Sequence, residues 1–300
     1  MDVGCVQKDF VRIDTEETLR RLESFYADPS GRLSAEMRWL EEHGIDLVLS
    51  DVPSYPLQAA KRLGIPALLV ANFTWHDIYS AMPGIGNRAG LLEILREEYT
   101  CATLQFLPQC HIDNSVVARK QTVGFIGLKG RDAREELAGF LPAPIEDRTL
   151  VFIYLGQSDS SRIEWSALKN MRDCVFVTRD PIAQPSPSPN LFVLDGRFSY
   201  PDLIASSDVV CTKAGYSTLA TAFAHGKPAI SCDREGFCEF GAVRDFMERN
   251  EVGLIVDSGK FYSCDWSQAV KRARKLTVKG KTRLDGELDV VAEVRRLLQN

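Results

Sequence analysis

The sequence predicts an α/β protein of two domains, each built around a parallel β-sheet. The chain has 300 residues, and at roughly 100–200 residues per domain this length suggests two. Short apolar runs alternate with longer amphipathic runs in both halves, which is the pattern of repeated βα units. Leu141–Pro144 carries two prolines that cannot continue a helix, so we expect a linker there. With 45% apolar and 26% charged residues, the chain can bury an ordinary core.

The first half, residues 1–144, is expected to form one Rossmann-like domain. Its apolar runs predict the strands Ile45–Ser50, Ala67–Ala71, Leu104–Leu107 and Thr122–Ile126. Its amphipathic runs predict the helices Thr15–His43, a short one ending at Leu63, Leu91–Cys101 and Asp132–Phe140.

The second half, residues 145–284, restarts the same alternation. The expected strands are Leu150–Leu155, Val175–Thr178, Leu191–Leu194, Asp208–Thr212, Ala229–Cys232 and Leu254–Val256. The expected helices include Ile163–Met171, Tyr200–Ala205 and Phe240–Asn250, with two more at the end of the chain. We expect the last helix, 285–300, to pack back on the first domain.

The bulk properties exclude several classes of function. The formal net charge is −5 and no basic stripe is present, so a nucleic-acid partner is not expected. The eight cysteines form no CxxC pair and have no zinc-ligand spacing, which indicates reduced thiols in a cytoplasmic protein. No apolar run reaches the roughly 20 residues of a transmembrane helix. The sequence also lacks Asp-x-Asp, Walker A, HExxH and GxSxG motifs, and we expect neither a metal nor a cofactor.

The segment Asp208–Gly226 has the pattern strand, tight turn, helix. Gly215 is expected to make the turn, and Tyr216 or Ser217 to open the helix, with Ser217 a good N-cap residue. Free backbone N–H groups at such a helix start suit a phosphate, and Lys213 adds a cation. An ordinary βα turn without a ligand has the same pattern, so both interpretations stand.

The loop after the next strand gathers charged side chains at the same edge of the sheet. Asp233, Arg234, Glu235 and Glu239 surround Gly236 and Phe237. Ligands of open α/β sheets bind at the carboxyl ends of the strands, where a carboxylate can accept ribose hydroxyls and an arginine can hold a phosphate. The alternative is a solvated charged loop.

Together these two segments resemble the GT-B glycosyltransferases. The matching residues are Lys213-x-Gly215-Tyr216 followed by Asp233-Arg234-x-x-Phe237-x-Glu239. The chain is most similar to little-characterised bacterial members and to the glycosyltransferase-like N-terminal region of plant arabinokinases. The segments Asp2–Gln7 and Asn72–Trp75 resemble the interior of the first domain of that family, so the resemblance covers nearly the whole chain.

The resemblance implies two Rossmann-like domains whose parallel sheets face a cleft, with a nucleotide diphosphate sugar in the second domain. The turn Gly215–Thr218 would face the diphosphate, and Asp233 and Glu239 would lie near ribose or sugar hydroxyls. The implied binding residues are Gly156, Gln157, Lys213, Gly215, Tyr216, Ser217, Thr218, Asp233, Arg234, Phe237 and Glu239.

The chain departs from the family in several places. Ala214 stands where a proline is usual, Ser217 where a small glycine is common, and Gly156-Gln157 where relatives often have two glycines. The first βα unit, with a Gly-His-Gly-type loop, has no counterpart, so the first domain is expected to be incomplete.

A catalytic base is expected at the ligand edge of the first domain, because inverting transfer requires deprotonation of an acceptor hydroxyl. Asp51 ends a strand, and His76 and Asp77 follow the next one. An aspartate after a strand also serves as a helix cap, and His76 is also compatible with a surface histidine.

The sequence supports three functional hypotheses. The first is a metal-independent glycosyltransferase moving a hexosyl or pentosyl group from a nucleotide sugar to an unknown acceptor. The second is a non-catalytic nucleotide-sugar-binding relative acting as a sensor or partner subunit, which the missing unit and altered glycines favour. The third is a nucleotide-sugar 2-epimerase, whose usual acid and base residues find no match. The donor base, sugar, acceptor, stereochemical outcome and oligomeric state are left open.

Overall fold

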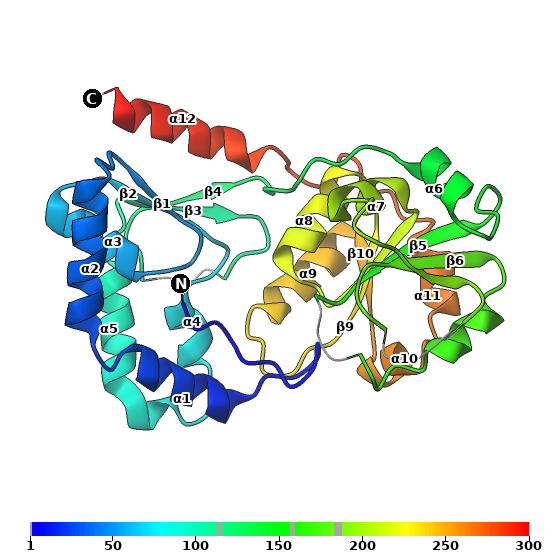
Figure 1. The fold of residues 1–300 in the computed structure, drawn as a ribbon, viewed down its shortest axis with the longest axis horizontal. Coiled ribbons are helices and arrows are strands. Elements are labelled where there is room, and N and C mark those ends of the chain that lie inside the picture. The colour runs from blue at the N-terminus through cyan, green and yellow to red at the C-terminus, as the bar shows by residue number, and fades with distance from the viewer. Residues whose placement is uncertain (1, 113–115, 157–159, 183–187, 300) are drawn as a thin grey trace.

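The computed structural model describes residues 2–112, 116–156, 160–182 and 188–299. It contains two β-sheets, one from each half of the chain, and the paired strands are parallel in both. Figure 1 shows them side by side, with the first half in blue and cyan and most of the second in green to orange. The predicted α/β class with two Rossmann-like units is confirmed.

The first sheet has the strand order β1-β2-β3-β4. Its strands are β1 (Val48–Ser50), β2 (Ala67–Val70), β3 (Leu104–Pro108) and β4 (Lys120–Val123). The helices of this half are α1 (Thr15–Phe25), α2 (Pro29–Glu42), α3 (Tyr55–Leu63), α4 (Trp75–Ser80) and α5 (Ala89–Tyr99), with a 3₁₀ turn η1 (Ile85–Arg88). The C-terminal helix α12 (Gly286–Leu298) returns to this sheet, where Val290 packs with Leu68 and Phe106.

The second sheet has the order β10-β9-β8-β5-β6-β7. Its strands are β5 (Thr149–Tyr154), β6 (Cys174–Thr178), β7 (Leu191–Val193), β8 (Val209–Thr212), β9 (Ala229–Cys232) and β10 (Gly253–Val256). Its helical elements are α6 (Arg134–Phe140), η2 (Trp165–Asn170), α7 (Tyr200–Ser206), α8 (Tyr216–Ala224), α9 (Phe240–Asn250), α10 (Ser258–Tyr262) and α11 (Ser267–Ala273). The chain builds outward from β5 to β7 and then restarts at β8 on the other side of β5. The carboxyl ends of β5 and β8 therefore form the point where such sheets bind ligands.

Two helix predictions were wrong for identifiable reasons. The single helix expected over Thr15–His43 is two helices, because Asp28 caps a new helix that begins at Pro29, whose ring suits a first turn. The expected α-helix Ile163–Met171 is the 3₁₀ segment η2, with hydrogen bonds to the third residue back.

A short N-terminal segment, residues 7–12, crosses to the second half, and we call it the hook (Figure 1). Phe10 is 0% exposed and lies with Val11 in the core of the second half, not of the first. Its ring lies 5.4 Å from that of Phe261 and 5.1 Å from that of Tyr262, centroid to centroid. The buried carboxylate of Asp9 holds the hook together by accepting hydrogen bonds from the amides of Val11 and Arg12, both at 2.9 Å.

A second crossing, residues 124–130, packs backbone against backbone. A Cβ added to Gly127 would lie 2.7 Å from the Ala220 carbonyl oxygen on α8, and one on Gly124 would lie 2.5 Å from that of Leu284. Only glycine permits contacts this close.

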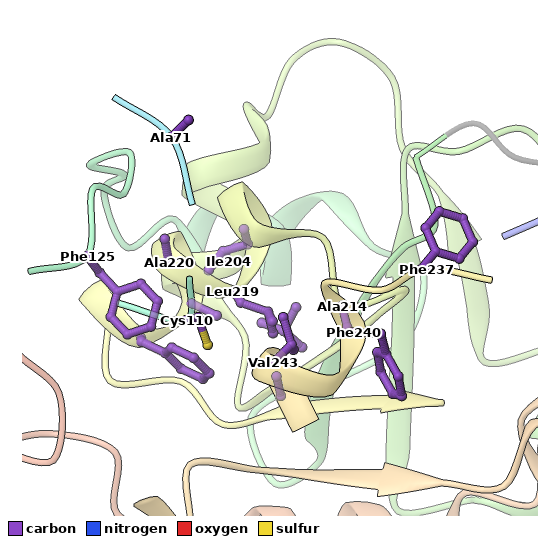
Figure 2. Close-up of a cluster of buried hydrophobic side chains, with 14 of the residues drawn as sticks. Ala71, Cys110, Phe125, Ile204, Ala214, Leu219, Ala220, Phe237, Phe240 and Val243 are labelled. Carbon is purple, nitrogen blue, oxygen red and sulfur yellow. The ribbon is translucent and has the colours of Figure 1, made fainter. Parts of the chain in front are cut away.

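The two halves share one hydrophobic cluster, shown in Figure 2. Ala71, Cys110 and Phe125 of the first half belong to the same cluster as Leu219 on α8 and Val243 on α9. Phe125 packs edge-on against Phe223 and Phe246, with centroid distances of 5.4 and 5.1 Å, and lies 5.8 Å from Tyr216. The faces that bring the halves together are therefore apolar and packed.

Candidate functional site

The sheet order brings separated segments of the sequence to one edge. β5 pairs with both β6 and β8, and β8 pairs with β9. Because these strands are parallel, their carboxyl ends meet at the same edge. Gly156 follows β5, Lys213 follows β8 and Asp233 follows β9, so the three predicted segments are neighbours in space.

The turn after β8 differs in detail from the prediction. Gly215 is the N-cap of α8 with an ordinary φ of −68°, whereas Ala214 adopts a left-handed φ of +58°. Ser217 was expected to be the N-cap, but it lies inside the helix, where its carbonyl oxygen accepts a hydrogen bond from Thr221 at 2.8 Å. The core around Ala214, which is 4% exposed, imposes the conformation that the sequence assigned to glycine.

The start of α8 presents backbone donors. The first bond of the helix runs from the amide of Leu219 to the carbonyl of Gly215, at 3.1 Å. The amides of Tyr216, Ser217 and Thr218 therefore precede the helical ladder, where a helix binds anions.

Lys213 carries its ammonium group to the end of β5. A Cβ on Gly156, whose φ is +71°, would lie 2.7 Å from the Lys213 Nζ, so glycine makes room for the cation. The same Nζ donates to the Gln7 Oε1 of the hook at 3.4 Å. Burial lowers the pKa of Lys213, nearby Arg234 lowers it further, and Asp180 opposes both. Gln157, predicted to bind beside Gly156, lies outside the described residues.

The loop after β9 holds a buried arginine. The side chain of Arg234 is 5% exposed, and its guanidinium carbon lies 3.2 Å from the centroid of the Phe237 ring. Its Nε donates to the Phe10 carbonyl oxygen of the hook at 3.0 Å. Its Nη1 lies 3.9 Å from the Glu239 Oε1, and burial lowers the pKa of Arg234 to about 10.

Two atoms of this pair have no partner within the described part of the chain. The Arg234 Nη2 and the Glu239 Oε2 are both buried and make no hydrogen bond there. Burial raises the pKa of Glu239, against the effects of its backbone hydrogen bond and of Arg234. Asp233 of the same loop is exposed, and Phe237 is buried beneath the guanidinium.

In the first half, Asp51 follows β1 and faces the second half. Burial raises its pKa, and the nearby Asp2 carboxylate adds to the rise. Asp51 and Cys110 are close enough to Tyr216 on α8 to raise the pKa of that tyrosine, which burial raises most.

The structure does not bring His76 and Asp77 together with Asp51. Asp77 is buried in a capping box at the start of α4, where its carboxylate accepts from the Thr74 amide at 3.0 Å and its amide donates to the Thr74 Oγ1 at 3.2 Å. Burial lowers the pKa of His76, and its charged neighbours besides Asp77 are Arg96 and Glu93 on α5. Only Asp51 of the three expected bases faces the second half.

Three residues at the same edge carry no clear signal in the sequence. Tyr154 ends β5, Arg179 follows β6, and Tyr200 begins α7. The two tyrosine rings lie 4.6 Å apart, and the guanidinium carbon of Arg179 lies 4.5 Å from the Tyr200 centroid. An aromatic residue at the end of a strand is a weak signal, and the strand order is needed to see that these residues meet.

Two features that would change the class of site are absent from the described residues. These residues contain no helix long and apolar enough to cross a membrane. They also contain no cluster of three or more histidine, cysteine, aspartate or glutamate side chains arranged to hold a metal ion.

Comparison with known proteins places the chain among glycosyltransferase-like sequences, although no family model matches it. It is 25% identical over 285 residues to L-arabinokinase of Arabidopsis thaliana, covering 92% of this chain but only 27% of that protein's length. It is 27% identical over 281 residues to an uncharacterized glycosyltransferase of Methanopyrus kandleri, covering 87% of this chain and 77% of that one.

Solved structures show the same architecture. The calicheamicin glycosyltransferase CalG4 matches with a TM-score of 0.65 at 15% identity, over 95% of this chain and 81% of that one. The spinosyn rhamnosyltransferase SpnG, in complex with thymidine diphosphate, matches with 0.59 at 13% identity, over 93% and 80%. MurG of Acinetobacter baumannii matches with 0.56 at 15% identity, over 88% and 77%.

Proposed function

We propose that this chain, which has the GT-B fold and sequence homology to the N-terminal region of arabinokinase and to a glycosyltransferase, transfers a sugar from a nucleotide diphosphate to an acceptor. One observation carries the proposal. The adjacent strands β6, β5, β8 and β9 end, in that order, in an aromatic–arginine group, a glycine beside a lysine, a free helix start and a buried arginine–glutamate pair. A nucleotide sugar has the same order of parts: base, diphosphate, sugar.

The diphosphate belongs at the centre of this row. Amides of Tyr216, Ser217 and Thr218 supply aligned donors, and Lys213 supplies a full positive charge beside the open space at Gly156. Partial burial strengthens the attraction, because charges interact more strongly away from bulk water.

The nucleobase belongs at the Tyr154, Tyr200 and Arg179 group. Aromatic and guanidinium faces stack on bases, and base–aromatic stacking contributes about 1–3 kcal/mol per base. This group lies on the β6 side of the diphosphate position, which leaves the β9 side for the sugar.

Asp51 is the proposed base. Its carboxylate removes the proton of the acceptor hydroxyl as that oxygen bonds to the anomeric carbon, and the bond from that carbon to the diphosphate breaks with its electrons. Lys213 and the α8 amides then stabilise the negative charge on the leaving diphosphate, so the protein itself supplies the positive charge that departure needs.

A thermal-shift panel with UDP, GDP, TDP and ADP tests the donor site. One nucleotide should stabilise the protein, by roughly 2.7 kcal/mol at 100 times its Kd. Lys213→Ala should remove most of that shift, whereas Lys260→Ala, at an exposed lysine on α10, should retain it. If none of the four nucleotides stabilises the wild type, the proposal is wrong.

A nucleotide-sugar-binding protein without transferase activity is the second candidate. It is favoured by the position of Asp77, which is committed to its helix cap and leaves Asp51 as the single expected base facing the second half. Release of nucleoside diphosphate from a bound nucleotide sugar, with acceptor present, separates the two: a protein that binds but never turns over is the second kind.

A further inference from the structure

The arginine–glutamate pair after β9 contains two buried polar atoms with the capacity for a further partner. They are the Arg234 Nη2 and the Glu239 Oε2, neither of which makes a hydrogen bond within the described residues. A buried polar atom without a partner costs about 1–3 kcal/mol, so such atoms indicate a bound water or a ligand group. A role for this pair in sugar binding rests on the proposed donor site.

The Arg234 side chain is fixed in orientation. The Phe237 ring lies against one face of the guanidinium, the Phe10 carbonyl accepts from Nε, and Glu239 lies beside Nη1 at 3.9 Å. These three contacts leave Nη2 as the donor that is free to serve a ligand. A donor held in this way recognises position as well as charge.

The charges of the pair select the kind of group that fits. A carboxylate on the ligand would be attracted by Arg234 but repelled by the neighbouring Glu239, and an ammonium group would meet the reverse. A hydroxyl oxygen can accept from Nη2 while its proton is donated to Oε2, so one hydroxyl satisfies both atoms.

We propose that the donor sugar is neutral and that one of its hydroxyl groups bridges Arg234 and Glu239. The position agrees with this, because β9 follows β8 in the sheet and so lies on the sugar side of the diphosphate position. A sugar that is deoxygenated at that carbon leaves both protein atoms unpaired. A sugar with a carboxylate or an amine there places a like charge beside one of them.

The test measures the gain in affinity that the sugar adds to its nucleotide. Calorimetry with the nucleotide selected by the panel compares the bare diphosphate with its glucose, deoxyglucose, glucuronate and glucosamine conjugates. The glucose conjugate should bind roughly 10- to 100-fold more tightly than the conjugate deoxygenated at the bridging position, the range expected for hydrogen bonds to charged groups. In turnover, kcat/KM should fall by about 10⁴-fold or more for that deoxy sugar.

Variants connect the gain to the pair. Glu239→Gln and Arg234→Lys should each abolish the preference for the hydroxylated sugar while leaving affinity for the bare diphosphate within about twofold. The control is Glu235→Gln, an exposed carboxylate in the same loop, which should leave the preference intact. Preference of the wild type for the glucuronate or glucosamine conjugate, or an unchanged preference in Glu239→Gln, would overturn the inference.

Failure of the donor site itself gives a different result. If no diphosphate binds, the proposed function fails, and free glucose and arabinose at high millimolar concentration then decide the hydroxyl inference. The sugars should raise the melting temperature of the wild type and of Glu235→Gln but not of Glu239→Gln. If they stabilise all three equally or none of them, the pair does not recognise a hydroxyl.

Discussion

Replacing Phe10 by alanine tests whether the hook belongs energetically to the second half. Phe10 is fully buried, packs on Phe261 and Tyr262, and lies near the start of the chain, more than 200 residues away from both. Removing a buried phenylalanine side chain forfeits about 1.5–3 kcal/mol of transfer free energy, and the cavity raises the total to about 3–5 kcal/mol. Two aromatic contacts lie within that sum, at about 0.5–1.5 kcal/mol each. Set against a typical total of about 5–15 kcal/mol, this loss is large.

The assay is urea unfolding followed by tryptophan fluorescence. Trp266 is a suitable reporter, because it is fully buried and its ring centroid lies 5.1 Å from that of Phe261. The unfolding midpoint of Phe10→Ala should fall while the slope stays near the wild-type value.

The matched control is Phe140→Ala. Phe140 is also a phenylalanine but is 39% exposed at the end of α6, so its loss should cost less than about 1 kcal/mol. Equal losses for the two variants would refute the reasoning, because the hook would then be a surface strand with no part in the core. A small loss together with faster exchange of the Glu235 amide, which donates to the Val11 carbonyl at 2.8 Å, would mean that the hook detaches locally.

Three further predictions concern the base, the crossing and the cap. Asp51→Asn should lower glycosyl transfer by about 10²- to 10⁴-fold without loss of stability, since burial disfavours the native carboxylate. Because the pKa of Asp51 is raised and the base acts when deprotonated, wild-type activity should fall as pH drops through a value above the ordinary 3.9 or so of aspartate; a pH profile without that limb excludes Asp51. Gly127→Ala should destabilise by about 1–3 kcal/mol, whereas Gly139→Ala, with open space around it in α6, should be neutral or slightly stabilising; thermal unfolding compares them, and equal shifts would contradict the close packing at Ala220. Asp77→Ala should cost about 1–2 kcal/mol by loss of its capping box and keep its transfer chemistry; loss of activity with unchanged stability would make Asp77 the base instead.

The alternation of βα units was predictable because burial on both faces of a parallel sheet makes each strand a short apolar run. That regularity is enough to place β5, β8 and β9, and hence to expect Gly156, Lys213 and Asp233 at one edge. The turn conformation was assigned to the wrong residue. Glycine is the usual occupant of a left-handed position, whereas here packing around Ala214 holds that residue there instead.

Other features depend on distant contacts that no local pattern records. Phe10 reads as an ordinary apolar residue until the chain folds and places it against Phe261. The pairing of Tyr200 with Arg179 requires the order of the strands. The cap at Asp77 is different, because Thr74-x-x-Asp77 resembles a capping-box signature, and it favours a structural role for that carboxylate.

The crossings make the halves exchange parts. The hook carries Phe10 into the second core, and α12 carries Val290 back to the first sheet. A backbone cut within Leu141–Pro144 would therefore yield two pieces that each hold something the other lacks. Such pieces should remain associated and, when expressed separately, reassemble in the manner of a split reporter protein. The linker that looks like a boundary in the sequence is thus a place where this molecule tolerates a break.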